Sequence, residues 1–233
     1  IADGLGMVNV TKVGTGAQNW FGLSTYTGVT TITGLVTVDS LADGELASGI
    51  GASSSAAGNL VFDGGGLVYA GTIRNGQLTL GSASATTNRL FTVGGSGATL
   101  SSTATNNNAI IWSNFGAIVH GTNADRTFTF TGTSTGDNTF NPQINDSAGF
   151  STSLTKTGSG QWNLGNTNNT YTGATTINEG ILALNDNGAL SDESPLYLTS
   201  TSTSSVAVLQ MSGLFERELS SSLIVIPGTN TVT

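Results

Sequence analysis

The chain has 233 residues, of which only 9% are charged and 33 are glycine. Its net charge of −8 argues against a nucleic-acid-binding surface, and its apolar residues, which alternate with Thr, argue against disorder. It has no cysteine, which excludes disulfides, and no apolar run approaches the roughly 20 residues of a membrane-spanning helix.

The first predicted unit occupies residues 11–38 and returns at 155–184. Both copies open with Thr-Lys and a Gly-x-Gly corner, and both continue to Tyr-Thr-Gly followed by alternating Thr and Ile or Val. The only two lysines of the chain, Lys12 and Lys156, occupy the same position of the repeat. Each copy predicts three short strands separated by glycine corners. Such a unit cannot bury its own apolar face, so we expect the units to stack.

Between the two copies, the chain keeps short apolar-alternating runs but lacks the repeat motif. Residues 40–55 hold the best helical pattern, but three glycines there favour a loop. Short apolar-alternating runs follow, separated by Gly, Ser or Asn, at 59–62, 77–80, 89–93, 110–112, 117–119 and 126–130. They bring the expected total to about 20 strands, or about seven rungs in a stack about 35 Å tall. No linker interrupts residues 1–233, so we expect a single all-β solenoid domain. The start of the chain resembles no secretion signal, which favours a mature protein or a segment of a longer one.

The second copy carries a family resemblance. Leu-Thr-Lys-Thr-Gly-Ser-Gly-Gln-Trp at 154–162, followed by Tyr-Thr-Gly-Ala-Thr-Thr-Ile-Asn-Glu-Gly-Ile-Leu at 171–182, resembles the autotransporter-associated β-strand repeat, also called the passenger-associated transport repeat. The first copy departs from it, because Ala-Gln-Asn-Trp at 17–20 replaces Gly-x-Trp. The resemblance implies a right-handed parallel β-helix with about three short strands per rung, secretion, and a place in a long bacterial surface protein. The family shares no catalytic residues, so none is transferred to this chain.

The lone histidine and the aromatic residues suggest little chemistry. His120 follows an apolar run, and a corner or surface position is the favoured interpretation, since one His without Cys cannot form a typical zinc site. Trp20, Trp112 and Trp162 are predicted to pack in the core, with a sugar-binding face as the alternative. The Asn-rich segments 106–108 and 166–169 predict either stacked amides or simple polar turns.

Paired carboxylates would permit glycoside hydrolysis, which some β-helices catalyse. The acids are thinly spread, however, and the densest groups are predicted to be solvated or salt-bridged: Asp186, Asp192 and Glu193, and Glu216-Arg217-Glu218. Three others, Asp63, Asp137 and Asp146, lie beside Gly or Asn, where turns favour Asp for backbone reasons.

The sequence therefore predicts no catalytic, cofactor-binding or metal-binding residue and no cofactor. The leading hypothesis is a non-enzymatic structural component of a bacterial extracellular fibre, sheath or surface stalk, assembled by end-to-end self-association. The alternative is an adhesin that binds surface glycans, and a polysaccharide-degrading enzyme is less favoured. We expect an extracellular or cell-surface location, with no nucleic-acid partner and no membrane insertion of this segment.

Overall fold

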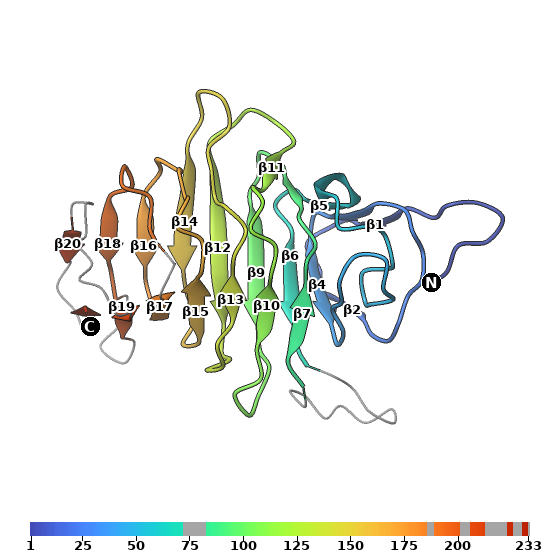
Figure 1. Cartoon of the computed structure of the whole chain (residues 1–233), viewed down its shortest axis with the longest axis horizontal. Helices are drawn as coiled ribbons and strands as arrows, with labels where there is room; N and C mark the ends of the chain where they lie inside the picture. The colour runs from blue at the N-terminus through green and yellow to red at the C-terminus, as the bar shows by residue number, and fades with distance from the viewer. Residues whose placement is uncertain (72–82, 186–188, 201–205, 213–222, 226–229, 233) are drawn as a thin grey trace.

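The chain folds as a stack of short parallel strands (Figure 1). A computed structural model describes residues 1–71, 83–185, 189–200, 206–212, 223–225 and 230–232. Within these residues, 21 strands form three parallel sheets, and the only helix is a 3-10 turn at Ala57–Asn59. The right-handed parallel β-helix predicted from the sequence is confirmed. The predicted strand at 77–80 lies outside the described residues.

Each strand pairs with the strand in the same sheet one rung away. Sheet 1 contains β1 (Val10–Lys12), β3 (Thr30–Ile32), β5 (Leu60–Phe62), β8 (Thr92–Val93) and β11 (Val119–His120). Sheet 2 contains β2 (Gln18–Trp20), β4 (Leu35–Val38), β6 (Gly66–Tyr69), β9 (Ala98–Ser102), β12 (Arg126–Gly132), β14 (Thr152–Lys156), β16 (Thr175–Ile177), β18 (Leu196–Leu198) and β20 (Leu223–Val225). Sheet 3 contains β7 (Ala85–Thr87), β10 (Ile110–Trp112), β13 (Thr139–Phe140), β15 (Gln161–Leu164), β17 (Gly180–Asn185), β19 (Ala207–Ser212) and β21 (Asn230–Val232).

The described strands form nine rungs, because sheet 2 contributes one strand to every rung and has nine. Three strands per rung hold in the middle of the stack, from β5 to β13. The first two rungs have strands in sheets 1 and 2 only, and the last four have strands in sheets 2 and 3 only. The estimate of about seven rungs was therefore too low, since it assumed three strands in every rung.

Each repeat copy spans two rungs and contains four strands. The first copy forms β1 to β4 and the second forms β14 to β17, because the opening Thr-Lys segment is itself a strand. The first copy turns the corner between sheets 1 and 2, whereas the second turns the corner between sheets 2 and 3. The same motif thus occupies different faces of the β-helix in the two copies, and the second copy lies one face further round.

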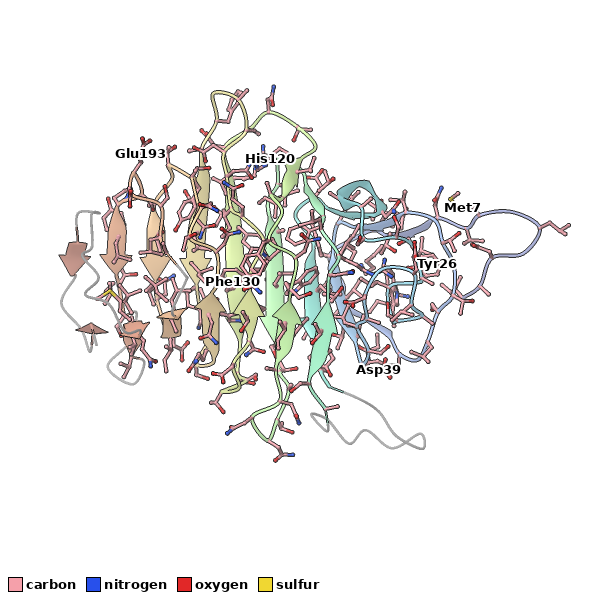
Figure 2. The ribbon with its side chains drawn as sticks, in the orientation of Figure 1. Met7, Tyr26, Asp39, His120, Phe130 and Glu193 are labelled. Atoms are coloured by element: carbon pink, nitrogen blue, oxygen red, sulfur yellow. The ribbon has the colours of Figure 1, made fainter. Side chains whose placement is uncertain are left out.

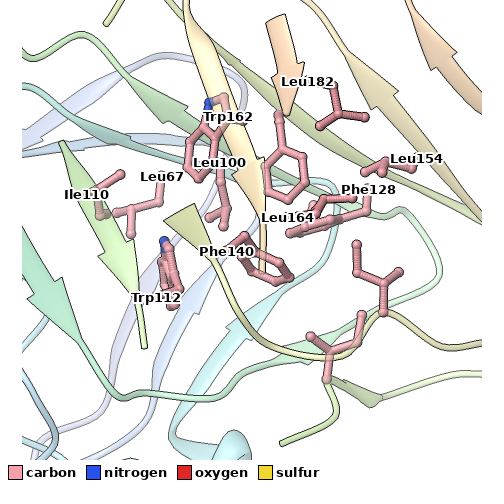
Figure 3. Close-up of a cluster of buried hydrophobic side chains, with 14 of the residues drawn as sticks. Leu67, Leu100, Ile110, Trp112, Phe128, Phe140, Leu154, Trp162, Leu164 and Leu182 are labelled. Carbon is pink, nitrogen blue, oxygen red and sulfur yellow. The ribbon is translucent and has the colours of Figure 1, made fainter. Parts of the chain in front are cut away.

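Aromatic rings fill the interior of the middle rungs. Phe91 packs edge-on against Phe62 and Trp112, with ring centroids 5.3 Å apart in both pairs, and Phe130 stacks on Trp162 at 4.7 Å. Figure 3 shows this column continuing into the leucines of the C-terminal rungs. Inward residues alternate with outward Thr and Ser along the strands, which is the period-2 pattern seen in the sequence.

A loop covers the face that lacks a strand in the first rungs. Residues 40–55 form no helix, as predicted, and insert Leu41 and Ile50 into the core. The buried guanidinium of Arg89 supports this loop by donating to the Ser53 hydroxyl at 2.8 Å and to loop carbonyls.

Candidate functional site

The repeat lysines lie inside the helix and bind backbone carbonyls at the corners. Lys156 Nζ donates to the carbonyls of Thr157 at 2.8 Å, Gly158 at 2.6 Å and Glu179 at 3.0 Å, and the last of these belongs to the next rung. Lys12 repeats the first two bonds, with Val13 and Gly14. Burial lowers the pKa of Lys156 to about 8. The lysine of the motif is therefore a structural cap for the corner.

The Tyr-Thr-Gly segment of the repeat joins one rung to the next. The buried Tyr171 hydroxyl pairs with the Thr175 hydroxyl at 2.7 Å, and burial raises the pKa of Tyr171 to about 12. Asp146 accepts from the amide of Thr152 at 2.6 Å and from the amide of Thr172, one rung further on, at 3.0 Å. The first copy has the same set of bonds, made by Tyr26 with Thr30 and by Asp3 with Val8 and Thr27.

Other aspartates also bind backbone amides across rungs. Asp63 accepts from the Ser96 amide at 2.9 Å, and Asp125 accepts from the Ser151 amide at 2.7 Å. Asp63 lies at a bend, whereas Asp146 lies in no turn, so the local turn prediction does not account for both; each instead binds an amide of a neighbouring rung. Asp137 instead binds the side-chain amide of Gln161 at 3.2 Å.

The acidic group at 192–193 lies in an exposed turn, and Figure 2 shows Glu193 pointing away from the stack. Asp186 and the Glu216-Arg217-Glu218 group lie outside the described residues.

His120 takes part in a polar network at the end of β11 (Figure 2). Its Nδ1 lies within hydrogen-bond distance of the Arg126 guanidinium, and its Nε2 lies 3.2 Å from Asn145 Oδ1. Since a guanidinium can only donate, Nδ1 accepts and the ring proton resides on Nε2. Burial, and next the charge of Arg126, lower the pKa of His120. Both ring nitrogens are therefore occupied by structural partners.

The three tryptophans differ in their surroundings. Trp112 and Trp162 are buried in the aromatic column, as predicted, whereas Trp20 is only partly buried at the first rung. Trp162 Nε1 donates to the Thr131 carbonyl at 2.9 Å, while Trp112 Nε1 has no partner among the described residues.

The Asn-rich segments act through hydrogen bonds to backbone. The buried Asn166 and Asn169 side chains donate to carbonyls of neighbouring rungs, at Asn141 and Ala189, instead of stacking on one another. Asn106 and Asn107 form a turn with positive φ.

One surface feature was not predicted from the sequence. An open pocket of about 310 Å³ lies beside the loop 146–151 and is lined by Asp125, Asp146, Phe150 and Thr172, among others. Phe150 interrupts a polar stretch between Gly149 and Ser151 without any strand alternation, which was the available signal.

The described residues contain no group of three or more His, Asp or Glu side chains that could hold a metal ion. The same residues include no helix that is long and apolar enough to cross a membrane.

The fold and its repeated corners define a parallel β-helix built from repeats. Residues 154–184 match the family described as Passenger-associated-transport-repeat, so the resemblance seen in the second copy is confirmed. The chain is also 40% identical over 152 residues to the Adhesin BmaC autotransporter of Brucella suis biovar 1 (strain 1330). This alignment covers 64% of the chain but only 4% of the relative, so the chain spans a small part of the relative's length. No solved structure matches the chain. The repeat and the relative indicate a surface-exposed or secreted protein.

Proposed function

We propose that this chain is a non-enzymatic stalk segment of a bacterial extracellular fibre, sheath or surface stalk, in which the β-helix continues end to end. The observation that carries the proposal is the unpaired outer edge of the first rung. Val10 donates to Val29 O at 2.9 Å, and Lys12 O accepts from Thr33, so both residues turn their backbone groups toward β3. Because alternate residues of a strand face opposite neighbours, the amide and carbonyl of Thr11 point away from the stack, where another rung could pair with them.

Exposed apolar side chains also support an interface at the end of the stack that contains the first rung. Of the twelve large apolar side chains exposed in the described residues, eight lie within residues 1–46, including Leu5, Met7, Val13 and Leu23. The N-terminal loop that carries Met7 projects beyond the first rung (Figures 1 and 2). Clustered apolar side chains of this kind favour burial against a further rung.

Stacking of one segment on another would be head to tail. The last rung, β20–β21, is a corner between sheets 2 and 3, whereas the first rung, β1–β2, is a corner between sheets 1 and 2. Matching these corners would turn each successive segment by one face. A head-to-tail contact of this kind does not close on itself and gives an open polymer.

The hydrogen bonds made by the aspartates support a non-enzymatic role. Asp3, Asp63 and Asp146 accept hydrogen bonds from backbone amides, so these carboxylates bind the fold, even though Asp146 also lines the pocket beside loop 146–151. Glycoside hydrolysis needs one carboxyl group to donate a proton and another to remain ionised across a bound substrate.

The test compares assembly of the chain with two variants of Thr11. Sedimentation velocity over a concentration series, with electron microscopy of the same samples, should show linear polymers that grow with concentration. Among the backbone hydrogen-bonding groups, Thr11→Pro removes only the outward amide and should shorten the polymers, whereas Thr11→Val loses the hydroxyl but keeps the amide and should not. A chain that stays monomeric at every concentration contradicts end-to-end assembly. Separately, cleavage of a pectin-like or alginate-like polymer that depends on one Asp or Glu contradicts the non-enzymatic role.

A further inference from the structure

The pocket beside loop 146–151 has contributions from three successive rungs. Asp125 comes from the rung before the loop, Phe150 from the loop itself, and Thr172 from the rung after it. At about 310 Å³, the pocket is large enough for a single sugar residue and is open to solvent.

Hydrogen bonds fix the shape of this pocket in the free protein. Asp125 Oδ1 accepts from the amide of Ser151 at 2.7 Å and from its hydroxyl at 3.2 Å. Arg126, which is buried, donates to the Ser147 hydroxyl at 3.2 Å, and the amide of Phe150 donates to Ser147 O at 3.0 Å. The loop is therefore held from both sides, so a ligand would meet a preformed site.

Two features of the pocket are not explained by hydrogen bonds within the fold. Asp146 is explained by its interrung bonds, because Asp3 makes the same bonds in the first copy. By contrast, the second carboxylate oxygen of the exposed Asp125, Oδ2, accepts no hydrogen bond from the described residues, and Phe150 is 40% exposed. An exposed aromatic side chain and a carboxylate oxygen without a protein donor thus line the same pocket, a combination that packing alone does not require.

We propose that this pocket binds one neutral pyranose residue of a surface glycan. The ring of Phe150 would pack against the C–H face of the sugar, and Asp125 Oδ2 would accept hydrogen bonds from its hydroxyl groups. Acidic sugars fit poorly because two carboxylates line the pocket, and the nearby Arg126 is buried with its donors bound to protein acceptors. The proposal goes beyond the stalk role and does not depend on end-to-end assembly.

The experiment screens the whole chain against immobilised neutral and sialylated glycans, followed by titration of the best neutral oligosaccharide. Phe150→Ala and Asp125→Asn should each weaken binding about ten-fold or more, since charged hydrogen bonds and aromatic packing are of that size. Asp125→Asn keeps an oxygen for Ser151 and replaces only the free acceptor with a donor, so the loop should stay in place. Phe115→Ala removes a ring that is 60% exposed outside the pocket lining and should leave binding unchanged.

Three results would overturn the proposal: no neutral glycan bound at millimolar concentration, stronger binding of sialylated glycans, or binding that survives both pocket substitutions. Titration of the Thr11→Pro variant separates the two proposals, because it blocks the edge of the first rung while leaving the pocket intact. Loss of assembly with retained binding in this variant is the result expected if both proposals hold. An unsubstituted chain that assembles but binds no glycan overturns only the pocket proposal, and a chain that binds glycan but never assembles overturns only the stalk proposal.

Discussion

Replacement of Gly180 by alanine tests whether the repeat glycine is required by close contact between corners. Gly180 has φ +72°, and a Cβ there would fall inside van der Waals contact of the Gly158 and Gly160 carbonyl oxygens and 2.7 Å from Lys156 Nζ. The left-handed backbone alone costs an alanine roughly 1–2 kcal/mol. The clash adds to this because the rung spacing is fixed by the β15–β17 ladder, so the corner must open and disturb the bonds of Lys156.

We expect Gly180→Ala to lower the free energy of unfolding by about 3–5 kcal/mol, which is the range of severe core disruptions. Gly14→Ala is the matched control, since Gly14 has φ +75° but open space where its Cβ would lie, and it should cost only about 1–2 kcal/mol. Urea unfolding followed by circular dichroism measures both. If the two substitutions cost the same, the glycine is retained for its backbone conformation alone and the close-contact argument is wrong.

Three further predictions concern buried polar groups. Since burial lowers the pKa of Lys156 to about 8, the unfolded chain binds more protons between pH 8 and 10.5, so stability should rise with pH across that window by up to about 3 kcal/mol; thermal melts of the protein and of Lys156→Met should differ in this slope, and equal slopes would refute it. The lowered pKa of His120 acts in the same direction at lower pH: the melting temperature should fall as the pH drops below about 6.5, because protonation buries a charge and also places two cations in contact, and His120→Gln should reduce that fall between pH 7 and 5.5. Trp162→Phe should destabilise the fold by about 1 kcal/mol more than Trp112→Phe, because only Trp162 loses a hydrogen bond; urea midpoints that are equal, or reversed in order, would contradict this.

Alternation and repetition were enough to predict the solenoid. Thr-Phe-Thr-Phe at 127–130 can only bury one side of a strand, and two copies of one motif imply stacking, so the parallel sheets follow from local pattern. The number of rungs did not follow. Segments such as 40–55 complete a rung as loops, and nothing in their composition says that they replace a strand.

The role of Lys156 was beyond sequence reasoning for a different reason. Its position in both copies showed that it matters, but its acceptors are backbone carbonyls at a corner and in the next rung. Backbone groups carry no sequence signal, so only the fold brings them to the ammonium. The pocket was missed on the same ground, since Asp125, Phe150 and Thr172 meet only because successive rungs stack.

The arrangement of charge connects the fold with its surface role. All four cationic side chains that the structure describes, those of Lys12, Arg89, Arg126 and Lys156, are buried and donate to carbonyls, while aspartates accept from amides at the turns. Charged side chains thus satisfy the backbone groups that corners leave unpaired, which a sheet cannot do for itself. The outward side chains of the strands are then not needed to bind unpaired backbone groups, so they can vary without affecting the stack. We therefore expect ligand binding at loops between rungs, as in the pocket at Phe150, and not on the strands themselves.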